Sequence, residues 1–399
     1  MEEYVIKNQK KLRLGITTGT CSAAAAQAAA IQLLLGVESH AVTLRTPKGM
    51  TVSVPVYLLE ADADRVSYKV VKDSGDDPDV TNGTDVCVTV AYAKQRVREQ
   101  IDGSQDRSCA FTSESFPYLT LDGGIGIGRV TKEGLEQAVG QAAINRVPRQ
   151  MIFAAVADVC EKANVSEPLH ITVWMPEGEA LAKRTFNPKL GIEGGLSVLG
   201  TSGILEPMSE QALIDTIRVE MRQKLANGME YLLVVPGNYG IDFLDQYGHG
   251  LQLEDAVKCS NFVGEALDAA VEFGAKGVLL VGHIGKFVKL AGGIMNTHSH
   301  NADARMELLT VHAALLGAPV ELLQKMMECV TTDDALKYLK EADLMEPVME
   351  RIMEKMEFYV NQRAQHQLEL GVITFSNVFG ILGQTKNVPD LVKKIGRDK

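Results

Sequence analysis

The sequence predicts two domains, one of mixed α+β type and one of α/β type. Its 399 residues exceed what a single hydrophobic core usually organises. Short β-rich segments joined by turns dominate the first half, whereas helices alternate with apolar strands in the second half. We therefore expect an N-terminal α+β domain with hairpins over residues 1–189. A C-terminal Rossmann-like α/β domain with terminal helices and a returning strand is expected over residues 190–399.

The N-terminal domain is expected to begin with a turn that opens a helix. Thr17, Thr18 and Thr20 precede an alanine-rich run. Threonine is a favoured N-cap, and alanine has the highest helix propensity. Free amides and the helix dipole at such an N-terminus attract anions. A capped structural helix that packs through its alanines explains the same pattern, so this segment alone leaves both interpretations open.

The remaining elements follow from periodicity and turn residues. Residues 46–49 separate two β-rich segments and are typical of a hairpin turn. In the N-terminal domain, strands are predicted over 41–45, 51–56, 65–71, 85–92, 118–121 and 169–174, and helices over 134–143 and 151–163. In the C-terminal domain, strands are predicted over 231–235, 277–281 and 370–375, and helices over 209–226, 253–273, 302–316, 319–327, 332–342 and 345–363.

Composition and charge disfavour several classes of function. The net charge is -11 and the pI is near 5.3, so at neutral pH the negatively charged protein repels nucleic acids and anionic membrane surfaces. A local basic patch can still hold an anionic small molecule. The first 13 residues are highly charged and no apolar run reaches membrane-spanning length, so we expect a cytoplasmic protein. The six cysteines form no Cys-x-x-Cys pair, which disfavours a zinc knuckle and a redox dithiol.

Two glycine-containing loops follow predicted strands of the C-terminal domain, over residues 236–242 and 282–286. In an open parallel sheet, ligands bind beyond the carboxyl ends of the strands, where both loops can present amides to a nucleoside or a carboxylate. Neither loop is a phosphate-binding P-loop, because Phe287 follows Lys286 where that motif needs serine or threonine. Purely structural glycine turns remain an alternative.

Three further patterns leave their roles open. The glycines over residues 123–128 fail the spacing of a dinucleotide-binding fingerprint. The aspartates between residues 73 and 79 could bind a cation, act as a general base or cap turns. His298, His300 and Asp303 have a metal-like spacing that supports a metal-dependent hydrolase hypothesis, but they could equally organise the loop before a helix.

Taken in order, the motifs resemble the cobalt-precorrin-5B C1-methyltransferase (CbiD) family of anaerobic cobalamin biosynthesis. The resemblance extends from about Arg13 to Phe375. Its motifs are Thr-Thr-Gly-Thr-Cys at 17–21, Lys-Asp-Ser-Gly-Asp-Asp-Pro-Asp-Val-Thr at 72–81, the glycine-rich stretch at 123–131, Asn-Pro-Lys-Leu-Gly-Ile-Glu-Gly-Gly at 187–195, the stretch at 199–208, and Gly-His-Ile-Gly-Lys at 282–286.

The resemblance implies methyl transfer from S-adenosylmethionine to carbon C1 of a cobalt-containing tetrapyrrole, which gives cobalt-precorrin-6A and S-adenosylhomocysteine. No protein-bound metal is expected, because cobalt arrives with the substrate. The expected partner is this small-molecule tetrapyrrole, with no nucleic acid and no membrane, and a homodimer is plausible for an enzyme of this size.

The resemblance does not assign the cofactor pocket, so we choose the site residues for this reaction from the placement and chemistry of the loops. One of Asp76, Asp77 or His283 is expected to remove a proton as the macrocycle rearranges. The cofactor-binding residues are expected to be Gly237, Asn238, Tyr239, Gly240, Asp242, Gly282 and Gly285. The substrate-binding residues are expected to be Thr17, Thr18, Thr20, Asp73, Arg146, Arg149, Lys189 and Lys286, the cations among them pairing with tetrapyrrole carboxylates.

Three other functions stay open at this point. A metal-dependent hydrolase using His298, His300 and Asp303 predicts stoichiometric zinc or iron in the purified protein. A noncatalytic tetrapyrrole carrier predicts corrinoid binding without affinity for S-adenosylmethionine. A nicotinamide-dependent reductase is disfavoured by the glycine spacing over residues 123–128.

Overall fold

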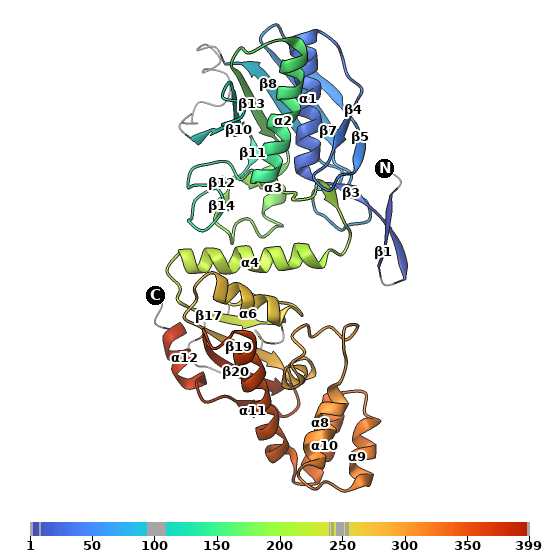
Figure 1. Ribbon diagram of the computed structural model, residues 1–399, viewed down its shortest axis with the longest axis vertical. Helices are drawn as coiled ribbons and strands as arrows, with labels where there is room; N and C mark the ends of the chain where they lie inside the picture. Colours follow the sequence, from blue (N-terminus) through green and yellow to red (C-terminus); the bar gives the residue numbers. More distant parts are fainter. Residues whose placement is uncertain are drawn as a thin grey trace. The chain divides into compact units, whose positions relative to one another are not determined.

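The computed structural model describes residues 3–7, 9–93, 109–238, 240, 243–244, 251 and 255–396. The chain forms two compact units, which divide between Ser209 and Glu210. Figure 1 shows the helices and strands of each unit. Within the described ranges, no helix is both long enough and apolar enough to cross a membrane.

A six-stranded sheet forms the centre of the N-terminal unit, in the order β6-β7-β8-β13-β10-β9. Of its strands, β7, β8, β13 and β10 are labelled in Figure 1. The pair β13 and β10 is parallel, and the other neighbours are antiparallel. The bounds are β6 Tyr57–Ala61, β7 Arg65–Val71, β8 Asp85–Tyr92, β9 Phe111–Thr112, β10 Leu119–Gly123 and β13 Leu169–Trp174. The strands predicted over 65–71, 85–92, 118–121 and 169–174 are therefore confirmed.

Two long helices, α1 (Thr18–Leu35) and α2 (Arg146–Ala163), pack against each other and against this sheet (Figure 1). The alanines of α1 between residues 23 and 30 are buried. Their small side chains let the helix lie close to its neighbours with almost no loss of side-chain entropy. The predicted cap is confirmed, since Thr17 Oγ1 accepts a hydrogen bond from the Thr20 amide at 3.3 Å.

Short strand pairs join the loops of this unit. The predicted hairpin is confirmed as β4 (Ala41–Arg45) with β5 (Thr51–Pro55). The other pairs are β1 (Tyr4–Lys7) with β2 (Lys10–Arg13), β3 (Gly15–Ile16) with β16 (Ile204–Leu205), β11 (Gly126–Ile127) with β15 (Gly195–Leu196), and β12 (Arg129–Val130) with β14 (Ile192–Glu193). The short helix α3 (Gly178–Ala182) packs on β11 and β15. Because β14, β15 and β16 all pair with earlier strands, the chain packs as part of this unit as far as Ser209, beyond Lys189 where we expected the boundary.

The helix predicted over residues 134–143 is wrong. The segment forms turns, and Ala142 makes an antiparallel bridge with Arg129. Gly134 and Gly140 have φ values of +95° and +90°, and such left-handed backbone positions cannot continue a right-handed helix.

A mostly parallel five-stranded sheet forms the centre of the C-terminal unit, in the order β18-β17-β19-β20-β21. The first four strands are parallel to one another, and β21 is antiparallel to β20. The bounds are β17 Tyr231–Val235, β18 Val257–Lys258, β19 Gly277–His283, β20 Glu369–Ser376 and β21 Gly380–Gln384. The predicted strands over 231–235, 277–281 and 370–375 are thus confirmed.

Helices cover both faces of this sheet. The helices α4 (Glu210–Ala226), α6 (Val263–Glu272) and α11 (Met345–Arg363) share one core with Leu232 and Val234, whereas α12 (Val388–Ile395) packs on Leu233 and Val235. Consecutive residues of a strand point to opposite faces, so the two cores lie on opposite sides. The helix predicted over 253–273 is shorter than expected, because residues 257–258 pair with β17 as an edge strand.

The connections after β17 and β19 leave the sheet on opposite faces. Phe243 and Leu244, which follow β17, pack in the core beside α12. Phe287 and Val288, which follow β19, pack in the core beside α6 and α11. The chain then returns to β18 on one side and to β20 on the other. Since β17 and β19 are neighbours, their carboxyl ends form the topological switch point at which open parallel sheets bind ligands.

A helical group lies between β19 and β20 in the sequence. It contains α7 (Ile284–Phe287), the 3₁₀ helix η4 (Val288–Gly292), α8 (Arg305–Ala314), α9 (Val320–Met327) and α10 (Thr332–Glu341), followed by α11. The helices predicted over 302–316, 319–327, 332–342 and 345–363 are confirmed with small shifts of their ends.

Candidate functional site

Both predicted cofactor loops lie at the switch point of the C-terminal sheet. A Cβ atom at Gly240 would lie 3.1 Å from the Val281 carbonyl oxygen and 3.2 Å from Val235 Cβ, so the loop after β17 lies directly over the two strand ends. Among the described residues, no atom lies within 4 Å of a Cβ placed at Gly237, so the space beside it is open to that extent. Tyr239 and Asp242 lie outside the described residues.

The glycines after β19 are required by packing within the chain. A Cβ at Gly282 would lie 2.4 Å from the Phe287 ring, and one at Gly285 would lie 3.2 Å from His283 Nδ1. These glycines let the loop fold back tightly at the end of the strand.

His283 caps the short helix α7 and lies at the end of β19. Its Nδ1 accepts the Gly285 amide at 3.0 Å, so in the neutral ring the proton is on Nε2. Burial lowers the pKa of His283, although the charge of Asp333 acts in the opposite direction. A neutral ring whose accepting nitrogen is already occupied can donate a hydrogen bond through Nε2 but is poorly arranged to remove a proton.

The lowered pKa of His283 predicts a pH-dependent effect of His283→Gln on stability. The folded pKa lies below the unfolded value, so the neutral ring contributes stability above the unfolded pKa of about 6.5, and this contribution is lost as the pH falls. The difference in free energy of unfolding between wild type and variant should therefore be smaller near pH 5 than near pH 8, measured by urea denaturation. A difference that does not change with pH would contradict this account of the ring.

Lys286 is a half-buried cation at the same strand ends. Among the described residues it forms no hydrogen bond or ion pair, and burial lowers its pKa. It lies close enough to Cys259 to be affected electrostatically, and the Cys259 amide donates to the carbonyl oxygen of Val235, the last residue of β17. Nearby, Lys258 Nζ donates to Asn238 Oδ1 at 2.9 Å. The switch point therefore presents a polar loop and an ammonium group that no described residue pairs with.

In the N-terminal unit, the loop over residues 199–203 encloses the N-terminus of α1. The Gly19 amide donates to the Leu199 carbonyl oxygen at 3.2 Å, and Thr20 Oγ1 donates to the Gly203 carbonyl oxygen at 2.6 Å. Thr20 is 0% exposed, so in this conformation it holds the loop and does not face a ligand. Thr17 and Thr18 are also buried.

The N-terminus of α2 adjoins that of α1. A Cβ at Gly19 would lie 2.9 Å from the Pro148 ring. The amides of Thr18 and Val147 have no acceptor among the described residues. The Arg146 side chain beside them is 73% exposed, with its Nε 3.8 Å from Glu136. The Glu136 carboxylate accepts the Arg146 amide at 3.1 Å and offsets part of the positive charge at the α2 N-terminus, so the electropositive surface consists of the Thr18 and Val147 amides and the exposed Arg146 side chain.

Most of the acidic loop serves the structure of this unit. Asp73 forms a bidentate pair with Arg13, with distances of 2.5 and 2.7 Å, and this pair lowers the Asp73 pKa. Asp76 Oδ2 accepts the Arg13 amide at 2.6 Å. Asp79 pairs with the buried Lys72 and accepts hydrogen bonds from Thr81. These contacts fix the loop against β2 and β3.

The close approach of this loop to β3 predicts a large effect of Gly15→Ala. A Cβ there would lie 2.2 Å from the carbonyl carbon of Ser74, and backbone atoms cannot rotate away. We expect the free energy of unfolding to fall by about 3 kcal/mol, the upper range for overpacking. Gly36→Ala is the control, because it meets no atom within 4 Å and costs only about 1 kcal/mol for its positive φ. Equal losses in the two variants, measured by chemical denaturation, would rule out the packing explanation.

Asp77 differs from its neighbours in the acidic loop. Its pKa is raised, first by burial and then by the charge of Asp79, while the Met208 amide donates a hydrogen bond to its carboxylate. No described cationic side chain forms an ion pair with it. A carboxylate with a raised pKa and only amide donors is suited to accept a proton. Of the three expected catalytic residues, Asp77 has the most suitable surroundings.

The other expected cations are placed differently. Arg149 stacks over the Phe111 ring at 4.3 Å and pairs with Glu136 at 3.2 Å, so both contacts hold it within the unit. Lys189 is exposed in a loop, with no described ion pair.

The predicted metal ligands do not converge on one point. Asp303 forms a bidentate pair with Arg305, and His298 Nδ1 accepts the His300 amide at 3.2 Å. In the part of the chain that the structure describes, no three histidine, cysteine or acidic side chains are grouped so that they could hold a metal ion. These residues therefore organise the loop before α8, and the hydrolase hypothesis has no structural support.

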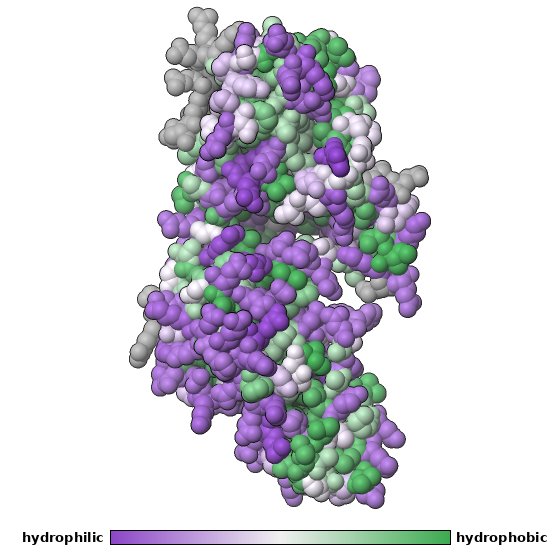
Figure 2. Space-filling view, viewed as in Figure 1, coloured by the Kyte–Doolittle hydropathy of each residue, from purple (hydrophilic) through white to green (hydrophobic). Residues whose placement is uncertain are grey.

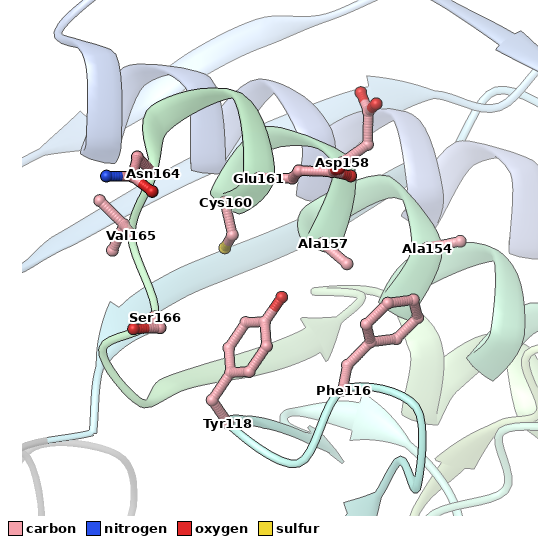
Figure 3. A pocket seen from close by; sticks show the side chains of 10 residues that line it. All are labelled: Phe116, Tyr118, Ala154, Ala157, Asp158, Cys160, Glu161, Asn164, Val165 and Ser166. Carbon is pink, nitrogen blue, oxygen red and sulfur yellow. The ribbon is translucent and has the colours of Figure 1, made fainter.

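An open pocket of about 480 Å³ lies between the end of α2 and the segment before β10 (Figure 3). Figure 3 shows the Phe116 and Tyr118 rings pointing towards Ala154 and Ala157 of α2. Glu161 and other polar residues of the last turns of α2 complete its wall. No expected site residue lines it, and an acidic rim disfavours a ligand with many carboxylates.

Exposed apolar side chains on the motif loops were missed by sequence reasoning. Ile125, Leu199 and Met208 are between 51% and 64% exposed, as is Phe186 directly before the 187–195 motif. Leu199 lies at the α1 N-terminus, and Met208 donates its amide to Asp77. Sequence-based reasoning concentrated on glycines and charges, whereas the signal was a large apolar residue inside a polar, turn-forming motif.

Comparison with known proteins gives matches in both units. The family model described as CbiD matches residues 5–207, and the model described as CbiD, C-terminal domain, matches residues 296–386. A solved structure of the cobalamin biosynthesis protein (cbiD) from Archaeoglobus fulgidus is 26% identical, with a TM-score of 0.39, and covers 76% of this chain and 87% of that chain.

Curated relatives match over the full length. The cobalt-precorrin-5B C(1)-methyltransferase of Ruminiclostridium cellulolyticum is 42% identical over 404 residues, covering 100% of this chain and 99% of that protein. The protein of the same name from Alkaliphilus metalliredigens is 38% identical over 393 residues, covering 98% and 97%. With its motifs, its full-length relatives and both family models in agreement, the chain belongs to the CbiD family, the cobalt-precorrin-5B C(1)-methyltransferases.

Proposed function

We propose that this chain transfers a methyl group from S-adenosylmethionine to ring carbon C1 of cobalt-precorrin-5B, giving cobalt-precorrin-6A and S-adenosylhomocysteine. The observation that carries the proposal is the 42% identity over the whole length to a curated enzyme of that name. The switch point of the C-terminal sheet and the electropositive surface of the N-terminal unit each offer a site suited to one of the two reactants.

The methyl donor is proposed to bind at the switch point. Its nucleoside would lie against the loop at Gly237, Asn238 and Gly240, where backbone approaches the strand ends closely and the side beside Gly237 is open. Tyr239 and Asp242 belong to the same proposal. Lys286, suggested by the sequence for substrate carboxylates, is proposed to bind the carboxylate of the donor, because no described residue pairs with this cation at the strand ends.

The tetrapyrrole is proposed to bind to the N-terminal unit. Its apolar macrocycle would lie on Leu199 and Met208, which are exposed beside the α1 N-terminus and Asp77. Its peripheral carboxylates would pair with Arg146 and with the free amides of Thr18 and Val147. Thr17, Thr20 and Asp73 would support this surface through the loops they hold. Arg149 and Lys189 remain proposed contacts for more distant carboxylates.

The residues have three tasks in this reaction. S-adenosylmethionine supplies an electrophilic methyl group on a sulfonium and leaves as the thioether. The site must align C1 with this methyl group and exclude water, which is a task of positioning. When C1 attacks with an electron pair, the macrocycle gains one positive charge, and loss of one proton restores its charge. Asp77 is proposed to accept that proton.

The test combines binding with product analysis. Isothermal titration with S-adenosylhomocysteine should show saturable binding, and mass analysis after incubation with S-adenosylmethionine and cobalt-precorrin-5B should show one added methyl group. A folded protein that binds the corrinoid but neither nucleoside would be a carrier, and the methyltransferase proposal would be wrong.

A further inference from the structure

Two polar atoms lie buried without partners where α8 and α11 pack together. His312 of α8 is 6% exposed, and its Nδ1 makes no hydrogen bond with any described residue. The Nε of Arg351 on α11 is buried and unpaired in the same way. The two helices are in contact. Buried polar groups in folded proteins nearly always have a partner, so these two atoms, unpaired among the described residues, are available to hydrogen-bond a bound species.

The charged side chains that act on the His312 ring are cationic. The charges of Arg351 and Lys355 act on the His312 ring and, together with burial, lower its pKa, and no carboxylate opposes them. Arg351 and Lys355 lie one turn apart on α11 and therefore on the same side of that helix. Among the described residues, neither forms an ion pair with an acidic side chain.

Exposed apolar side chains lie on the same two helices as this cationic cluster. Val311 and Leu315, at α8 and its C-terminal end, are 55% and 62% exposed, and Phe358 on α11 is 55% exposed. Phe358 lies two turns after Arg351, and Lys355 Nζ lies 5.7 Å from the centre of its ring. Figure 2 shows hydrophobic surface gathered at the helical end of this unit, around α8 to α10. A ligand here would meet apolar surface beside the cations.

We propose that His312, Arg351 and Lys355 form a binding site for an oxyanion carried on an apolar body. Arg351 and Lys355 supply the positive charge, and His312 supplies a buried ring nitrogen. Val311, Leu315 and Phe358 receive the apolar part. A carboxylate and a phosphate monoester share this oxyanion chemistry, and the site uses none of the residues proposed for methyl transfer.

The test is isothermal titration calorimetry of the full-length protein with three ligands in separate experiments: 2-naphthoate, acetate and inorganic phosphate. Saturable binding of 2-naphthoate, at least about 10-fold tighter than acetate, is expected from burial of the apolar ring. Arg351→Gln should weaken this binding by about 10-fold or more, the loss expected for a hydrogen bond to a charged group. Binding of phosphate as tightly as 2-naphthoate would overturn the apolar part of the proposal.

The matched control is Lys325→Gln, which removes one positive charge from α9 in the same helical group. Lys325 has no ion pair among the described residues. It should leave 2-naphthoate affinity unchanged. Equal weakening by both variants, or no saturable binding to wild type, would overturn the proposal. His312→Gln gives a second check, because its circular dichroism spectrum and melting temperature can show that it folds while its affinity falls.

Discussion

Replacing Asp77 with asparagine should lower the single-turnover rate of C1 methylation by about 100-fold or more, the usual effect of removing a general base. Asparagine keeps an oxygen that can accept the Met208 amide but has no carboxylate to take the proton. Affinity for cobalt-precorrin-5B should change little. The rate is measured by rapid quenching and mass analysis with enzyme in excess over tetrapyrrole.

The raised pKa of Asp77 predicts opposite effects of Asp77→Asn on activity and on stability, so the two can be distinguished. Because its folded pKa is raised, Asp77 contributes stability below its unfolded pKa of about 3.9 and loses that contribution as the pH rises through the folded pKa. At neutral pH the ionised side chain is therefore unfavourable, and Asp77→Asn should be at least as stable as wild type. The wild-type rate should fall as the pH drops through the raised pKa, and the variant should lack this dependence.

The control for this experiment is Asp85→Asn on β8. Asp85 pairs with Lys69 at 2.8 Å on a partly exposed part of the sheet and belongs to no proposed site. It should keep the wild-type rate and the same pH profile. If Asp77→Asn also keeps them, another group removes the proton and the assignment of Asp77 is wrong.

Local patterns were sufficient to predict most of the secondary structure. The strands β7 and β17 have their predicted ends, because β17 is a continuous apolar run and β7 alternates valine and tyrosine with polar residues along most of its length. The segment over residues 134–143 contains helix-favouring residues, but its backbone is determined by Gly134, Gly140 and a bridge to β12. A two-residue strand such as β18 has too little local signal, since its pairing with β17 defines it.

The site could be predicted only in part, for a physical reason. The rule for parallel sheets selected the loops after β17 and β19, and these strands prove to be neighbours at the switch point. The contact of Thr20 with Gly203, across most of the N-terminal unit in sequence, could not be inferred from spacing. The different roles of the four aspartates between residues 73 and 79 could not be inferred from spacing either, because their partners include residues of β2 and of the segment that ends at Met208.

Lys286→Met should weaken binding of S-adenosylhomocysteine by about 10-fold to 100-fold, since a hydrogen bond to a charged group contributes about 1.5–3 kcal/mol. Lys286 is half-buried at the switch point and has no acidic partner among the described residues. A ligand carboxylate would supply that partner. Methionine approximates the length of the lysine side chain, so the packing at the strand end should be preserved while the charge is removed.

A comparison of two nucleosides, one with a carboxylate and one without, tests whether Lys286 binds the carboxylate of the donor. 5′-Methylthioadenosine has the nucleoside but no carboxylate, so its affinity should be the same for wild type and Lys286→Met. Lys276→Met is the control, because Lys276 pairs with Glu230 at 2.6 Å beside the opposite end of β19. An equal loss of affinity for both nucleosides would mean that Lys286 supports the fold of the loop. If Lys286→Met leaves the affinity for both nucleosides unchanged but weakens tetrapyrrole binding, Lys286 binds a carboxylate of the tetrapyrrole substrate and not that of the methyl donor.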